Sequence, residues 1–275
     1  MECLSTLTEL PVLDLVGLAA SFIFLCYSSW QDIRKREVTD RVWLFSYPAA
    51  LGILSARLLA QNSSWSLIVG SVAAAAIVSL ALPLLGLWGG ADGKAFLCLA
   101  LMNPIAPALD SPTSHIVNPL FPLVVFSNAY VASVSSMLYA IQRNLRTRPL
   151  HELFDGLEDE RSFRKIAAFL TGYRIPVNKL KSKPFIFPLE TIHRQGSSIS
   201  RHFSFEMSVD TDVQKELEEI EALTDSGLLH GTMWVTPGIP FLVFLTVGLV
   251  VTLTLGDIIW RLVSCLLYTS DAADE

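Results

Sequence analysis

Residues 10–29 read LPVLDLVGLAASFIFLCYSS, and the basic residues Arg34, Lys35 and Arg36 follow shortly after. About 20 mainly apolar residues are what a helix needs to cross the hydrocarbon core of a bilayer. Six stretches of this kind can be placed along the chain: Leu10–Ser29, Val42–Ala60, Trp65–Trp88, Lys94–Leu109, Pro119–Gln142 and Pro237–Gly256. The sequence therefore predicts an all-α polytopic membrane protein with six transmembrane helices.

The composition of the 275-residue chain agrees with a membrane protein. Hydrophobic residues make up 52% of it and charged residues 17%, with a mean hydropathy of +0.48, whereas soluble domains carry about 25% charged residues. The four cysteines form no CxxC pair, which argues against a disulfide framework and against a zinc knuckle. The net charge of −6 argues against a nucleic-acid partner.

The basic residues orient the predicted helices. If the N-terminus lies outside, 18 of the 20 Lys and Arg residues fall on the cytoplasmic side, and only Arg57 and Arg261 fall opposite. The loop at residues 34–41 carries most weight, because the positive-inside rule applies best to short loops. We therefore expect a multi-pass protein of the cell membrane, in contact with lipid, whose N-terminus is outside.

Four regions differ in composition. Residues 1–142 are expected to form a membrane domain of five helices, and residues 237–264 the last transmembrane helix. Between them, residues 143–236 are rich in charge and predict a small cytoplasmic domain. Residues 265–275, CLLYTSDAADE, resemble a non-native tail and are excluded from functional reasoning.

One helix is predicted within the cytoplasmic domain. Asp210 and its neighbours offer N-cap oxygens, Val213 to Leu223 supply an apolar face, and Gly227 ends the run. The pieces around residues 183–193 and 202–207 are short strands or loops, and the pattern does not decide between them.

Aspartates near the predicted spans are candidates for chemistry, because an ionised acid at the centre of a transmembrane helix costs about 2.5–3.5 kcal/mol. The topology places Asp32 and Asp92 at the cytoplasmic boundary and places Asp14 and Asp257 on the opposite side. Two facing carboxylates share a proton, so one can activate water while the other protonates an amide carbonyl. The pair predicts peptide hydrolysis that requires no metal and no cofactor.

Residues beside the two acids have two readings each. Gly89, Gly90 and Gly93 either let another chain approach Asp92 closely or form only a flexible connection. Arg34, Lys35 and Arg36 either tune Asp32 and contact substrate, or only mark the topology and contact lipid phosphates. Lys94 either pairs with Asp92 or reaches the lipid headgroups.

Three motifs together resemble the archaeal preflagellin peptidases, which are relatives of the type IV prepilin peptidases. These motifs are QDIRKREV at 31–38, GGADGK at 89–94 and WVTPGIP at 234–240. Ala91 stands where the family most often has glycine. The resemblance implies a GxGD intramembrane aspartyl endopeptidase with Asp32 and Asp92 as its catalytic residues.

The resemblance also implies a substrate class. The expected enzyme removes the basic leader, a class III signal peptide, from archaellin and pilin-like precursors at the cytoplasmic membrane face. Bacterial relatives often carry paired CxxC zinc motifs and methylate the new N-terminus. Because this sequence lacks those motifs, we expect peptidase activity alone.

An ion- or proton-coupled transporter is the alternative, since intramembrane acids also relay ions. Against it, the two acids lie at one face and no inverted repeat is evident. The 234–240 motif also has a purely structural reading, because Pro is favoured at helix starts and Trp at membrane interfaces. The oligomeric state is left open.

Overall fold

The computed structural model divides into two compact units, which are described separately here. The membrane unit comprises residues 1–133 and 240–275, and the insert unit comprises residues 134–239. The structure describes residues 2–60, 65–85, 88–107, 116–147, 153–180, 185–195, 198–205, 218–220, 222–224, 226, 231–238 and 240–271.

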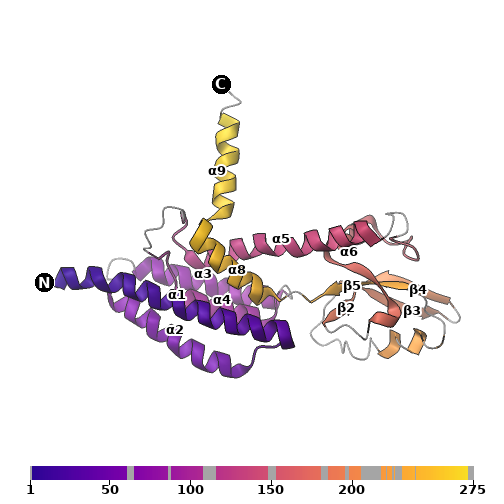
Figure 1. Ribbon diagram of the computed structural model, residues 1–275, viewed down its shortest axis with the longest axis horizontal. Helices are drawn as coiled ribbons and strands as arrows, with labels where there is room; N and C mark the ends of the chain where they lie inside the picture. The colour runs from indigo at the N-terminus through magenta and orange to yellow at the C-terminus, as the bar shows by residue number, and fades with distance from the viewer. Residues whose placement is uncertain are drawn as a thin grey trace. The chain divides into compact units, whose positions relative to one another are not determined.

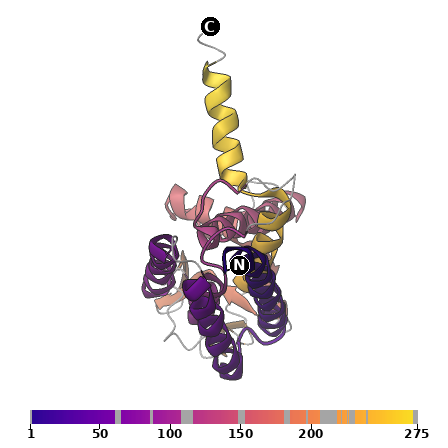
Figure 2. The same ribbon diagram turned by 90° about the vertical axis from the view of Figure 1, so that its left-hand side faces the viewer.

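The membrane unit is helical wherever it has regular structure within the described ranges. Helices α1 and α2 pack against each other, and α4 packs against α1, α2, α3 and α8 (Figures 1 and 2). The helices of this unit are α1 (Glu2–Lys35), α2 (Asp40–Ala60), α3 (Trp65–Leu84), α4 (Gly90–Met102), the first half of α5 (Phe121–Thr147), α8 (Phe241–Leu255) and α9 (Ile258–Asp271). The expected all-helical architecture is therefore found in this unit.

Four helices are long and apolar enough to cross a membrane, namely α1 from Val12, α2, α3 and α5. The pair α8 and α9 would add a fifth crossing, although it is bent by 57°. The bend falls at Gly256, which has a φ of 76° and whose carbonyl accepts a hydrogen bond from Asn128. The predicted last span, Pro237–Gly256, contains α8, and α9 follows it after Gly256 and Asp257.

Helix α4 is shorter than the predicted fourth span, which was placed at Lys94–Leu109. It has 13 residues and ends at Met102, so it is about 20 Å long, less than the hydrocarbon core. Pro104 explains this end, because a proline disfavours the helical conformation in the residue before it. Six spans are therefore not evident from helix length alone.

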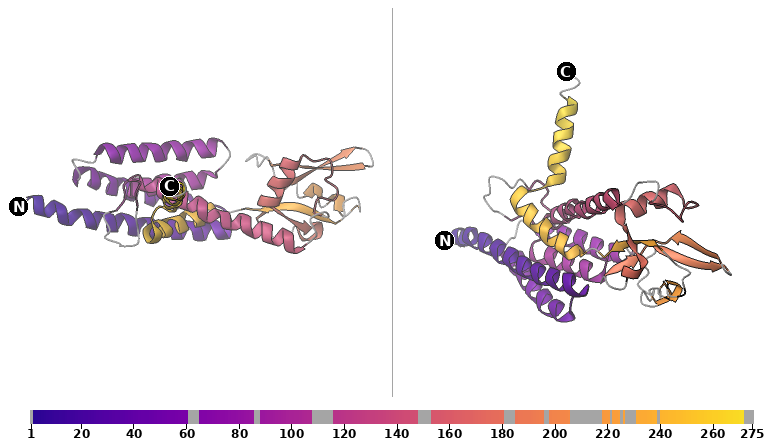
Figure 3. Two further views of the ribbon diagram at one scale, coloured as in Figure 1. Left: turned by 90° about the horizontal axis from the view of Figure 1, so that it is seen from above. Right: turned by 45° about the vertical axis from the view of Figure 1, so that its right-hand side comes forward.

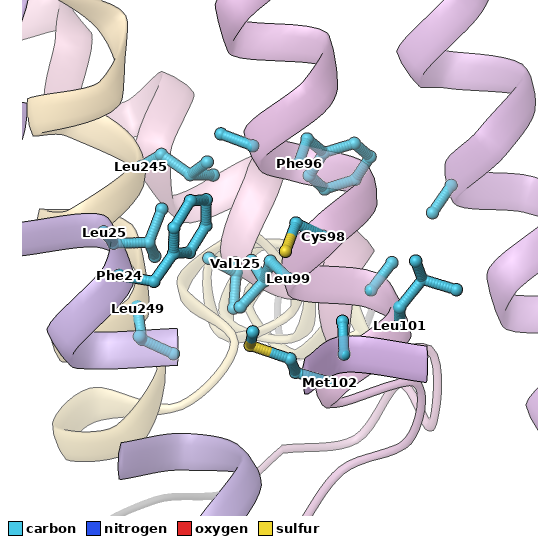
Figure 4. Close-up of a cluster of buried hydrophobic side chains, with 14 of the residues drawn as sticks. Phe24, Leu25, Phe96, Cys98, Leu99, Leu101, Met102, Val125, Leu245 and Leu249 are labelled. Carbon is cyan, nitrogen blue, oxygen red and sulfur yellow. The ribbon is translucent and has the colours of Figure 1, made fainter. Parts of the chain in front are cut away.

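A short helix is tolerated here because protein surrounds it. Figure 4 shows Cys98, Leu99 and Met102 of α4 facing side chains of α1, α5 and α8. All residues from Cys98 to Asn103 are buried. Irregular backbone at membrane depth is stable only where protein or water covers it, and the buried residues Asn103 and Pro104 after α4 meet that condition.

The insert unit is a mixed α/β structure, so the all-α prediction is wrong for this part of the chain. Strand β5 lies between β1 and β2 in an antiparallel sheet, and β3 pairs with β4 in a hairpin that Figure 3 shows in orange. The elements are the second half of α5, α6 (Ser162–Thr171), β1 (Tyr173–Pro176), the 3-10 turn η2 (Val177–Lys179), β2 (Ile186–Pro188), β3 (Glu190–Gln195), β4 (Ser198–Phe203) and β5 (Thr232–Pro237). Of the two ambiguous pieces, residues 183–193 include β2 and the start of β3, and residues 202–207 begin in the last two residues of β4; residues 183, 184, 206 and 207 lie outside the described ranges.

The predicted helix that begins near Asp210 lies mostly outside the described residues. Residues 218–220 and 222–224 are helical, and Ile220 and Leu223 are buried.

Trp234 is a core residue of the insert unit. It is fully buried in the central strand β5, stacks on Phe154 at 5.3 Å, and donates from its indole to the carbonyl of Leu153. Its backbone N–H donates to Glu190. Burial raises the pKa of Glu190, while the charge of Arg201 opposes that rise. The suggested membrane-interface role of Trp234 is therefore wrong.

Candidate active site

Asp92 lies in the first turn of α4. The N-cap is Gly89, whose extended backbone lets its N–H donate to Asp92 Oδ2 at 3.2 Å, while the Asp92 N–H donates to the Gly89 carbonyl at 3.1 Å. This reciprocal cap fixes the carboxylate at the helix N-terminus. The positive end of the helix dipole favours a negative charge at this position.

Asp32 lies in the last turn of α1 and faces the start of a different helix. Its carboxylate accepts a hydrogen bond from the backbone N–H of Leu242, in the first turn of α8. The N-cap of α8 is Pro240, the last residue of the WVTPGIP motif. That motif therefore ends where α8 presents its N-terminus to Asp32, so each acid lies at the start of one helix.

The two aspartates belong to the same cluster of side chains. Both are half-buried, and they lie close enough for their charges to interact. Helices α1 and α4, which carry them, pack directly against each other. The structure thus brings two carboxylates that are far apart in the sequence within electrostatic range of each other.

The three motif glycines differ in what surrounds them. A Cβ on Gly93 would lie 2.6 Å from the carbonyl oxygen of Ser79 and 3.1 Å from Pro83, both on α3. A Cβ on Gly89 would meet the Asp92 carboxylate at 3.2 Å, and one on Gly90 would meet nothing within 4 Å. Gly93 is therefore required for packing, whereas Gly90 leaves open space near Asp92.

The basic residue beside Asp32 is Arg36 rather than Arg34 or Lys94. Arg34 lies over the ring of Trp30 at 4.7 Å, and Lys94 lies over Trp43 at 5.8 Å. The charge of Arg36, in contrast, interacts with Asp32. Arg36 follows the last residue of α1 and has a φ of 57°, so helical spacing alone does not account for this pairing.

An aromatic cluster adjoins Asp92 that sequence reasoning missed. Trp88 packs on Phe126 at 5.2 Å and on Phe241 at 4.9 Å, and Tyr130 packs on Phe126 at 4.7 Å. Tyr130 is close enough to Asp92 to interact with its charge. These residues come from α5, α8 and the segment before α4, so no local spacing could have indicated the cluster.

The other two aspartates near the spans have structural partners. Asp14 pairs with Arg57, and both side chains are buried. Asp257 accepts the backbone N–H of Trp260 at 3.0 Å and so caps α9. Neither acid belongs to the Asp32 and Asp92 cluster.

Relatives of this chain are named as peptidases. It is 24% identical to the preflagellin peptidase of Methanococcus voltae over 88% of this chain and 96% of the relative. For the preflagellin peptidase of Methanococcus maripaludis the identity is 26%, over 85% and 92%. A prepilin peptidase of Methanothermobacter thermautotrophicus is 26% identical over 56% of this chain and 42% of its own length.

Two family models match successive parts of the sequence. Residues 164–258 match the archaeal peptidase A24 C-terminus, type II, a region that contains β1 to β5 and α8. Residues 19–141, which contain both Asp32 and Asp92, match the type IV leader peptidase family. With these two matches in order along the chain, and relatives aligned over most of its length, the chain is similar to the type IV leader peptidases over both of its units.

Proposed function

We propose that the protein is an aspartic endopeptidase that removes the basic leader of archaellin or pilin-like precursors, with Asp32 and Asp92 as its catalytic residues. The observation that carries the assignment is the meeting of these two carboxylates, each at the N-terminus of a helix. The names of the relatives support the substrate class.

The chemistry follows from a shared proton. The ionised carboxylate takes a proton from water as the water oxygen attacks the carbonyl carbon of the scissile amide. The protonated carboxyl gives its proton to the carbonyl oxygen, and the tetrahedral intermediate then collapses as the amine leaves with a proton. The products are a new carboxyl end on the leader and a new N-terminus on the mature subunit.

The substrate must present an extended peptide, because an amide within a helix is already hydrogen-bonded. The open space at Gly90 supports an approach of that peptide next to Asp92. We place this site at the cytoplasmic membrane face, with the chain's N-terminus outside. The basic loop at residues 34–41, which follows Asp32, supports this orientation.

The test is a cleavage assay on membranes that contain Asp32→Asn or Asp92→Asn. The substrate is a precursor with a short basic leader before an apolar helix, and a shortened product is identified by gel mobility and mass. Each variant should lose at least about 100-fold in rate, the usual range for a general acid or base. Asp159→Asn, which removes an exposed acid of the insert unit, is the matched control and should cleave normally.

Normal cleavage by either membrane-unit variant would contradict the assignment of that aspartate. If the unmodified protein is folded, as a cooperative unfolding transition would show, and still does not cleave this precursor, the proposed substrate class is contradicted.

A further inference from the structure

Arg36 has a backbone conformation that side chains rarely adopt. It follows the last residue of α1 and has a φ of 57°, in the left-handed region. Glycine is the usual residue at this position after a helix, because it has no Cβ to clash there. An arginine in this conformation costs of order 1 kcal/mol or more, and such strain persists mostly where a function requires it.

The turn that contains Arg36 is held by its neighbours. The Arg36 N–H donates to the carbonyl of Asp32 at 3.0 Å. The buried side chain of Gln31 accepts hydrogen bonds from the N–H and the hydroxyl of Thr39, at 2.9 and 3.0 Å. These bonds fix the short connection between α1 and α2 and return the Arg36 side chain toward the end of α1.

The Arg36 guanidinium is partly withdrawn from solvent. Its Nε and Nη1 atoms are buried, and its charge interacts with that of Asp32. Electrostatic attraction is stronger in such a place than in open water. The neighbouring exposed cation, Arg34, lies over Trp30 instead.

Groups from several elements face the two acids. Asp32 has Arg36 from the α1–α2 turn, the N–H of Leu242 from α8, and Asp92 from α4. Asp92 has the Gly89 N–H and Tyr130 from α5. Among these groups Arg36 is the cation, and its charge interacts with Asp32.

We propose that Arg36 is a positioning residue of the peptidase, whose guanidinium keeps Asp32 as the ionised member of the pair. Asp32 is then the base that takes the proton from water, and Asp92 is the acid that protonates the carbonyl. This inference rests on the proposed function and assigns separate roles within it. Glycine would adopt the backbone conformation of this turn without strain, but it has no guanidinium to place near Asp32.

Three substitutions separate the charge of Arg36 from its backbone. Arg36→Gln removes the charge and keeps a side chain, Arg36→Gly relieves the backbone and removes the charge, and Arg36→Lys keeps the charge. Arg34→Gln is the matched control, because it removes a neighbouring charge that lies over Trp30. All four variants are made in the full-length chain and compared in kcat, KM and unfolding temperature.

We expect the Gln and Gly variants to lose about 10- to 100-fold in kcat near neutral pH, in line with the loss of an opposite charge beside an acid. KM should change little, and part of the rate should return at higher pH, where Asp32 ionises without help. The Lys variant should stay within about threefold of the unmodified protein, and Arg34→Gln should be unchanged.

Full activity in Arg36→Gly would overturn the proposal, since the position would then matter only for its turn. Equal losses in all three variants with an unchanged pH profile, or a loss of folded protein in the Gln and Gly variants, would also overturn it. These outcomes leave the proposed function intact if Asp32→Asn and Asp92→Asn still abolish cleavage, so the two failures are distinguishable.

Discussion

Arg57 and Asp14 form a buried ion pair within the membrane unit. Arg57 donates to the Asp14 carboxylate and also to the carbonyl of Leu13 at 3.1 Å. The pair needs close packing, because a Cβ on Gly17 would lie 2.9 Å from the Arg57 guanidinium and 2.7 Å from the Asn103 side chain. Two charged residues that look out of place in apolar stretches therefore neutralise each other.

Replacing one partner of this ion pair should destabilise the fold strongly. Asp14→Asn leaves the Arg57 charge buried without its carboxylate, and breaking a buried pair in this way costs about 3–5 kcal/mol. The double variant Asp14→Leu, Arg57→Leu should recover most of that loss. Reversible unfolding in detergent measures both, with Arg41→Gln as the control because Arg41 is exposed. A single variant as stable as the unmodified chain would contradict the assignment of a structural role.

The location of a residue could be predicted from the sequence only where it depends on the position of that residue along a helix. Contacts with side chains from other helices could not be predicted. The expected topology placed Asp32 and Asp92 at one face from their positions at helix ends, and the structure brings them together. It also placed Asp14 and Arg57 on one side, but hydropathy does not report which side chains meet. The sequence does not distinguish Arg36 from Arg34 and Lys35, because the backbone conformation of Arg36 depends on the turn around Gln31.

Helix α4 carries Asp92 and is the element that other helices surround. It packs on α1, α2, α3 and α8, and its contact with α3 depends on Gly93, which lies against the Ser79 carbonyl. The position of Asp92 therefore depends on how closely α3 and α4 approach at Gly93, the residue that follows the acid.

Gly93→Ala should push α4 away from α3. The added methyl group would meet backbone at 2.6 Å, and overpacking of this kind typically costs about 1–3 kcal/mol. Cleavage should fall with it, because Asp92 moves with α4. Gly70→Ala, on the open face of α3, is the control and should be neutral or stabilising by up to about 1 kcal/mol. The unfolding temperature and the cleavage rate of both variants give the test, and equal behaviour would refute this packing role.

The longer helices could be predicted closely and the shorter elements could not. Predicted spans at Val42–Ala60 and Trp65–Trp88 correspond to α2 and α3, since about 20 apolar residues leave few alternatives. For α4, the apolar sequence indicates that the segment is shielded from water. It does not indicate that other helices, rather than lipid, surround the segment. Strands of three to six residues in the insert unit are too short for periodicity to distinguish them from loops.

At the scale of the molecule, the two candidate catalytic residues lie in one unit, and the other unit has a hydrophobic core of its own. Both aspartates belong to the membrane unit, whereas the insert unit has its own clusters around Met233, Val235 and Trp234. The segment after β5 continues directly into α8, whose first turn faces Asp32.

The side of the membrane on which the insert unit lies depends on α4. If α1, α2 and α3 cross and the N-terminus is outside, Asp32 and Asp92 both lie at the cytoplasmic face. The insert unit then lies in the cytoplasm only if α4, with the irregular segment after Asn103, completes a crossing before α5 returns. The 13 Lys and Arg residues between 143 and 236 favour that side.

Cysteine labelling, in a variant without its natural cysteines, tests whether α4 crosses the membrane. A membrane-impermeant maleimide should label Val117→Cys on intact cells, and should label Glu37→Cys and Asp159→Cys only after the membrane is opened. All three positions are exposed, so accessibility within the protein does not limit the reaction. Labelling of Asp159→Cys on intact cells together with protection of Val117→Cys would mean that α4 turns back without crossing. That outcome would also contradict the position of the first turn of α8 beside Asp32, because α8 follows β5 of the insert unit in the chain.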